Sequence, residues 1–132
     1  MTIRVHVACN DAAFRSAIAD YLATEREIEI VGVSDEGQVG AAAVGLLAPD
    51  VVVLRAAPTV DPAERVRYFR RAAPGRALIA VCAAAGQAER FRPAGADRVV
   101  LEAAPARELR AAVKAAFRGV RSEPNQEAVL HS

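Results

Sequence analysis

Residues able to do chemistry follow four short apolar runs in this sequence of 132 residues. They are Cys9 with Asn10, then Arg55, Cys82 and Glu102. If the runs are parallel strands of one sheet, these side chains gather where the strands end, the usual place for functional groups in such sheets. A guanidinium offers five hydrogen-bond donors and no nucleophilic lone pair. The set therefore predicts ion pairing or anion binding.

The opposite charges of Arg55 and Glu102 suggest a direct or nearly direct ion pair across Cys82. A partly buried guanidinium without a counter-ion would be costly, so an acid is expected near it. In the alternative, Arg55 extends into solvent and Glu102 is an ordinary loop residue.

The elements that must position these residues alternate five times along the chain. The predicted strands are Ile3–Ala8, Ile28–Val33, Val51–Leu54, Ala77–Val81 and Val99–Leu101. Alternating strand–helix units require parallel pairing with right-handed crossovers, which places helices on both faces of the sheet. The predicted fold is α/β and flavodoxin-like: three layers, α/β/α, around a five-stranded parallel sheet of order 2-1-3-4-5.

The first two helices are predicted from caps, breakers and apolar period. Asn10 or Asp11 can cap the first. Its predicted buried face consists of Phe14, Ala17, Ile18, Tyr21 and Leu22. The second spans Glu36–Leu47, weakened by Gly37 and Gly40 and ended by Pro49.

Prolines mark the three remaining helices. Asp61-Pro62 predicts a helix start, and that helix ends near Pro74. Only a short helix, Gln87–Phe91, fits before Pro93. The last helix begins near Pro105, and its apolar residues recur at helical spacing: they are Leu109, Ala112, Val113, Ala116, Phe117 and Val120.

Length and composition predict one globular domain over residues 1–119, followed by a linker or disordered tail at 120–132. The net charge of +1 implies no strongly charged partner. Two cysteines, no signal-peptide core and no long apolar run predict a cytoplasmic protein with free thiols and no membrane segment. No cofactor is expected.

Other polar residues are interpreted structurally. Cys9 and Cys82 could form a redox switch, but the third strand should keep them too far apart for a disulfide, so two small buried residues are expected. His6 is predicted to be packed and not a metal ligand, since the other histidine, His131, lies in the tail.

The last helix carries basic residues opposite its apolar stripe, and we expect them to form a solvated outer face; they are Arg107, Arg110, Lys114, Arg118 and Arg121. The sequence has no aromatic platform and no helix-turn-helix pattern, so direct nucleic-acid binding is not predicted. Phosphate loops, catalytic triads and zinc-ligand spacing are also absent, and no enzymatic activity is predicted.

The chain from about Thr2 to Gly119 resembles response-regulator receiver domains, most of all those preceding a LuxR-type helix-turn-helix. The resembling segments are Ile3 to Val5 with Phe14-Arg15, Ile28 to Gly32 with Gly37, Pro49 to Leu54, Pro58 to Asp61, Gly95 to Asp97 and Glu108-Leu109. Their order and spacing imply the CheY-like form of the flavodoxin-like fold.

The resemblance also implies a phosphorylation pocket, but this chain departs from it at six positions. The acidic pair falls on Cys9 and Asn10, and the phosphoacceptor aspartate falls on Arg55. The hydroxyl residue falls on Cys82, the switch aromatic on Val99 and the lysine on Glu102. The resemblance is thus to an atypical receiver with a degenerate pocket. No magnesium site is expected, because the carboxylates that would hold the cation are missing. No acyl phosphate can form at position 55, because a guanidinium has no nucleophilic lone pair.

Two functions are compatible with this pattern. In the first, the chain is a phosphorylation-independent signalling and dimerisation module that regulates transcription through a DNA-binding output domain outside this chain. Its homodimer surface would include Ala12, Phe91, Arg110 and Lys114. In the alternative, the emptied pocket around Asn10, Asp11, Arg55 and Cys82 senses a small anionic metabolite.

Overall fold

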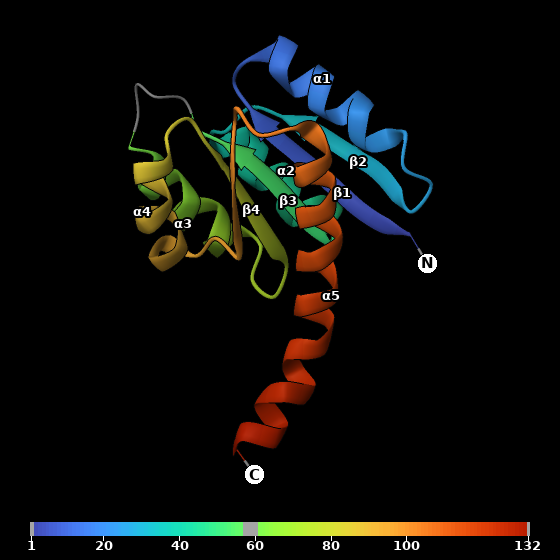
Figure 1. The fold of residues 1–132 in the computed structure, drawn as a ribbon, viewed down its shortest axis with the longest axis vertical. Helices are drawn as coiled ribbons and strands as arrows, with labels where there is room; N and C mark the ends of the chain where they lie inside the picture. The colour runs from blue at the N-terminus through green and yellow to red at the C-terminus, as the bar shows by residue number, and fades with distance from the viewer. Residues whose placement is uncertain (1, 57–60, 132) are drawn as a thin grey trace.

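In the computed structural model, strands and helices alternate in the predicted order (Figure 1). The structure describes residues 2–56 and 61–131, with side chains described in 2–56 and 61–119. The strands are β1 Ile3–Cys9, β2 Ile28–Ser34, β3 Val51–Arg55, β4 Ala77–Cys82 and β5 Arg98–Leu101. The helices are α1 Ala12–Ala23, α2 Gln38–Leu47, α3 Pro62–Ala72, α4 Ala88–Ala94 and α5 Ala106–His131, with a 3-10 turn η1 at Ala85–Gln87.

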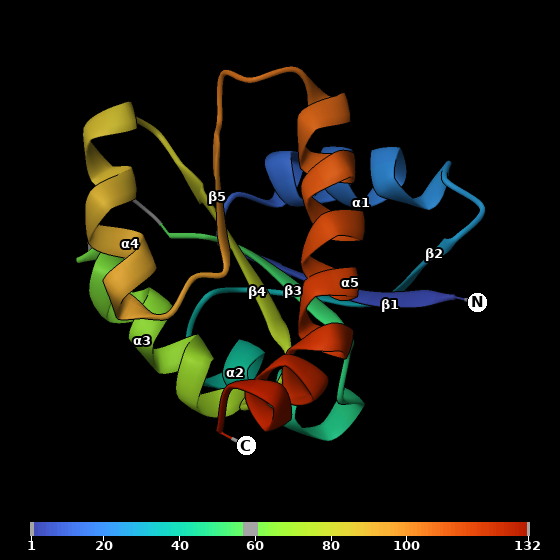
Figure 2. The ribbon, with the colours of Figure 1, turned by 60° about the horizontal axis from the view of Figure 1, so that its bottom comes forward.

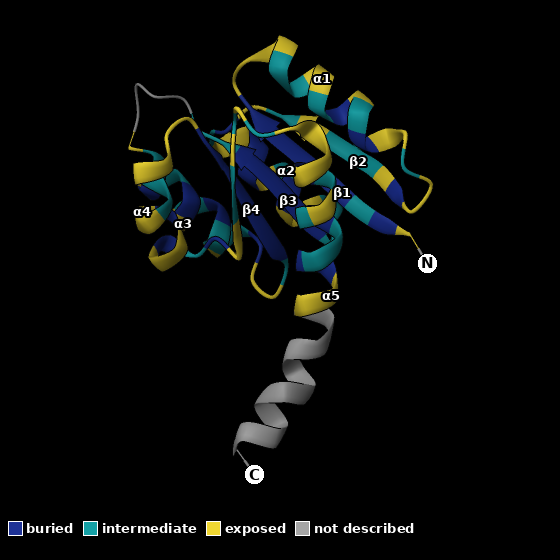
Figure 3. Ribbon diagram, in the orientation of Figure 1, coloured by how far each residue is buried: buried dark blue, intermediate teal, exposed yellow. Residues whose placement is uncertain are grey.

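The five strands form one parallel sheet of order β2-β1-β3-β4-β5, so the predicted topology is confirmed. Its central strands are covered on both faces, and Val51 to Leu54 are all buried (Figure 3). This explains why β3 is continuously apolar instead of alternating. Parallel pairing brings the ends of β1, β3 and β4 to one edge.

Two hydrophobic cores lie on opposite faces of the sheet. Figure 2 shows α1 and α5 on one side and α2, α3 and α4 on the other. Leu22 and Val113 belong to the first core, and Phe69 and Leu78 to the second; all four are fully buried. Among the described side chains of the last helix, those with the predicted apolar spacing do face the first core.

Helix α1 is rotated from its predicted orientation. Leu22 and Ala19 are its buried residues, whereas Ala17 is exposed. The remaining predicted members, Phe14, Ile18 and Tyr21, are half-buried and pack against the first core. Assigning Ala17 to the core was wrong, because the helix turns its 18–19–22 side toward the sheet.

Helix α2 begins at Gln38, two residues later than predicted. Glu36 lies before the helix, is fully buried, and donates its backbone N–H to Asn10 Oδ1 at 3.0 Å. Gly40 is more than a weak helix residue: a Cβ there would overlap the Asp35 carbonyl oxygen. Glycine permits this close approach of helix and loop.

Helix α4 runs past its predicted end. It includes Pro93 and stops at Gly95, which has a φ of 125°. The proline is tolerated in the last turn, where buried Phe91 and Ala94 hold the helix against the second core. Because Phe91 is 3% exposed, its predicted place in a homodimer surface was wrong.

Helix α5 continues to His131, so the backbone of residues 120–131 is helical where a linker or disordered tail was predicted. Extending a formed helix costs little compared with starting one. The division into a domain over 1–119 and a connecting segment stays a prediction. The Pro58 motif and the side chains of Val120 and Arg121 lie outside the described residues. No helix in the described ranges is long and apolar enough to cross a membrane.

The basic face of α5 is less solvated than predicted. Lys114 Nζ lies 3.3 Å from Glu25 Oε2 and 3.6 Å from Glu27 Oε2, and Arg110 Nε lies 3.7 Å from Glu25 Oε2. Arg110 also stacks over Tyr21, with its Cζ 5.4 Å from the ring centroid. Part of this face therefore ties α5 to α1 and the α1–β2 loop.

Candidate functional site

Arg55 and Glu102 form a two-pronged ion pair at the carboxyl edge of the sheet. Arg55 Nε lies 3.0 Å from Glu102 Oε2, and Nη2 lies 3.1 Å from Oε1. Their side chains are 19% and 32% exposed. The predicted ion pair is confirmed, and it is direct.

Strand topology explains how the pair reaches across β4. Arg55 is the last residue of β3, and Glu102 follows β5 directly. Between them, the Glu102 backbone N–H donates to the Cys82 carbonyl oxygen at 2.8 Å, which continues the β4–β5 pairing by one residue. The Glu102 carboxylate is thereby held within reach of the guanidinium.

Phe14 completes the setting of Arg55, and sequence reasoning missed this role. The Arg55 Cζ lies 4.6 Å from the Phe14 ring centroid, a favourable cation–π distance. Asp11 caps α1 by accepting the Phe14 N–H at 3.1 Å, which fixes the first turn of the helix. The available signal was the position of Phe14 in the first turn of α1, just after β1 ends at this edge of the sheet.

Cys9 lies on the third side of the guanidinium. Arg55 Nη1 is 3.8 Å from Cys9 Sγ, and the Cys9 thiol donates to the Asp11 carbonyl oxygen at 3.6 Å. The hydrogen bonds that Arg55 donates to Glu102 are the main cause that raises the pKa of Arg55, and burial opposes this rise. Arg55 is therefore a permanent cation among a carboxylate, a ring and a thiol.

The other predicted site residues serve neighbouring elements. Asn10 Oδ1 accepts the Glu36 N–H and so holds the β2–α2 loop. Cys82 is buried, and burial raises the pKa of its thiol. Val99 is half-buried and packs against the second core.

Two further observations bear on earlier expectations. Cys9 and Cys82 are free, buried and separated by β3, as the topology predicted. Glu36, a fully buried acid, was not singled out from the sequence because it blends into the predicted helix pattern.

The residues at this edge do not fit a hard divalent cation. Mg²⁺ prefers oxygen ligands, especially carboxylates, whereas Cys9 offers a thiol, Asn10 is occupied by a backbone donor, and Arg55 is itself cationic. Among the described side chains, no group of three His, Cys, Asp or Glu residues could hold a metal ion.

No family model matches the sequence, and neither does any curated protein. Solved structures match the arrangement of its elements. The signal receiver domain of the putative response regulator NarL from Mycobacterium tuberculosis superposes with a TM-score of 0.77 at 22% identity, over 89% of this chain and 98% of that one. The chain has the receiver fold.

Two more receiver structures agree. A two-component response regulator of the LuxR family from Aurantimonas sp. SI85-9A1 matches with a TM-score of 0.80 at 19% identity, over 98% of this chain and 99% of that one. A CheY-like receiver domain protein from Methanospirillum hungatei JF-1 matches with a TM-score of 0.76 at 20% identity, over 93% and 99%. At these identities the likeness establishes the receiver fold alone.

His6 is packed inside the receiver fold, as predicted. It is fully buried on β1, with Nε2 2.7 Å from Ser34 Oγ. In the described part of the chain, Nδ1 has no hydrogen-bond partner. A Cβ on Gly32 would lie 2.7 Å from this nitrogen and 2.7 Å from Leu47 Cδ1, so the glycine makes room for the ring.

Burial lowers the pKa of His6, which predicts a loss of stability in mild acid. The unfolded chain takes up a proton near the ordinary histidine pKa of about 6.5, before the folded chain does. The contribution of neutral His6 to the free energy of unfolding should therefore be complete above this pH. It should decrease as the pH drops from there toward the lower pKa of the folded chain.

Urea unfolding between pH 7.5 and 5.5 is the measurement, and the slope of stability against pH is the readout. His6→Gln should flatten this slope, while the matched change His131→Gln should leave it as in the wild type. An equal slope in the wild type and His6→Gln would contradict the prediction.

Proposed function

We propose that this chain is an atypical response-regulator receiver that works as a signalling and dimerisation module without phosphorylation. It is not an enzyme, and it acts in the cytoplasm. It regulates transcription through a DNA-binding output domain outside this chain, the arrangement that the LuxR-type resemblance suggests. The observation that carries the proposal is the two-pronged ion pair between Arg55 and Glu102.

The ion pair occupies both the position of the phosphoacceptor aspartate and the position of the lysine. Phosphoryl transfer to a receiver needs a carboxylate nucleophile and cations that neutralise the incoming oxygens. Here the position of the nucleophile carries a cation, and the position of the lysine carries an anion. The ion pair therefore links β3 to β5 permanently. In a phosphorylated receiver, this link would depend on a bound phosphoryl group and Mg²⁺.

The same geometry argues against the alternative of an anionic-metabolite sensor. Nε and Nη2 of Arg55 are already bound to Glu102, and Nη1 points to Cys9. A carboxylate or phosphate ligand would have to displace Glu102 from the guanidinium. A thermal-shift screen with small anionic metabolites is expected to show no stabilisation.

Incubation with acetyl phosphate and Mg²⁺ should leave the intact mass of the chain unchanged, because no carboxylate occupies position 55. Beryllofluoride with Mg²⁺ should likewise leave the unfolding temperature unchanged. A phosphorylatable receiver domain in the same buffer is the positive control. A phosphoryl adduct on the chain, mapped to any residue at this edge, would overturn the proposal.

A further inference from the structure

The outer face of α2 exposes large apolar side chains. Val39 and Leu46 are 74% and 86% exposed, the highest values among the large apolar residues of the described chain. With Ala42 between them, they follow helical spacing and form one stripe. We call Val39, Ala42 and Leu46 the α2 stripe. Contiguous exposed apolar side chains are typical of protein interaction surfaces.

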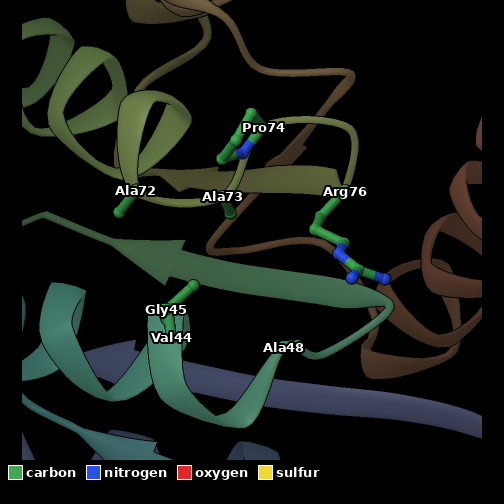
Figure 4. A pocket seen from close by; sticks show the side chains of 7 residues that line it. All are labelled: Val44, Gly45, Ala48, Ala72, Ala73, Pro74 and Arg76. Atoms are coloured by element: carbon green, nitrogen blue, oxygen red, sulfur yellow. The ribbon is translucent and has the colours of Figure 1, made fainter.

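A cavity of about 170 Å³ opens between the C-terminal part of α2 and the end of α3 (Figure 4). Gly45 lines it from α2 and Ala48 from just after that helix, Ala72 and Pro74 line it from the end of α3 and the turn that follows, and Arg76 lines it as well. A Cβ on Gly45 would meet nothing within 4 Å, so there is open space on the Gly45 side of the cavity. The exposed side chain of Leu46 thus follows directly on a residue that lines the cavity.

The charge pattern favours a second copy of the chain as the occupant. A two-fold contact presents the same patch from both subunits, so a charged patch would repel itself. The sequence from residue 37 to residue 49 contains no charged residue, although a quarter of the chain is charged. A strongly acidic or basic partner would find no complementary group on α2 itself, and Arg76 is the one charged residue among the described residues that line the cavity.

We propose that two copies associate through the α2 stripe about a two-fold axis near Gly45, with each Leu46 seated in the cavity of the other copy. This inference rests on the dimerisation part of the proposed function and gives it a surface. The contact replaces the predicted surface that included Phe91, which is buried.

Sedimentation of the full 132-residue chain over a wide range of concentration, in reducing buffer, tests the proposal. The wild type should show a concentration-dependent dimer. Leu46→Glu should raise the dissociation constant at least about tenfold, since it removes a central apolar anchor. Gly45→Gln should weaken the dimer similarly by filling the cavity.

Leu101→Glu is the matched control, because it makes the same change at an exposed leucine on β5. It should leave the dissociation constant unchanged, and circular dichroism should show that all variants fold. A wild type that is monomeric at every concentration overturns the proposal. A dimer lost in Leu101→Glu but kept in Leu46→Glu overturns the α2 surface while dimerisation stands. A phosphoryl adduct would overturn the proposed function and leave this result intact.

Discussion

Arg55→Met and Glu102→Gln are each expected to lower the free energy of unfolding by about 2 kcal/mol, between the values for exposed and fully buried ion pairs. Each change leaves the other charge partly buried without its partner. The double variant should lose little more than either single variant, because the stranded charge is removed as well. Urea denaturation of the four proteins should give a coupling of about 1.5 kcal/mol.

An exposed ion pair on α3 provides the matched control. Arg67 and Glu64 lie 3.0 Å apart, with side chains 45% and 62% exposed. Glu64→Gln should change stability by no more than about 0.5 kcal/mol. Zero coupling between Arg55 and Glu102 in the double-mutant cycle would show that the ion pair does not hold β3 to β5.

The ion pair could be predicted from the sequence because it depends on strand topology. Once five strand–helix units fix the order of a parallel sheet, the last residue of β3 and the first after β5 flank β4 at the same edge. Opposite charges at those two places then have few other partners. It was sufficient to know that Arg55 ends one strand and that Glu102 directly follows another; the path of the loops was not needed.

Phe14 and Glu36 could not be assigned in this way. The contact of Phe14 with Arg55 depends on the rotation of α1 about its axis, which the apolar pattern placed imprecisely, as exposed Ala17 shows. The burial of Glu36 depends on where α2 begins, and helix boundaries are poorly fixed by propensity alone. Sequence periodicity gives the existence of a helix more reliably than its rotation or its first residue.

Gly40→Ala is expected to lower the free energy of unfolding by about 3 kcal/mol, despite the better helix propensity of alanine. The added Cβ would overlap the Asp35 carbonyl oxygen and lie 2.7 Å from Ser34 Oγ. Ser34 Oγ in turn bonds to the Asp35 carbonyl and contacts His6, so the loop cannot yield without disturbing that buried contact. Thermal and urea unfolding measure the loss.

Gly45→Ala is the control within the same helix, because a Cβ at that position meets open space. Measured at protein concentrations below those at which copies associate, it should raise stability by about 0.5–1 kcal/mol. A loss of stability in Gly40→Ala together with a gain in Gly45→Ala would show that position 40 requires glycine because the β2–α2 loop lies so close to it. A gain at both positions would mean that the loop beside Gly40 can move away, and that Asn10 does not hold it firmly through the Glu36 N–H.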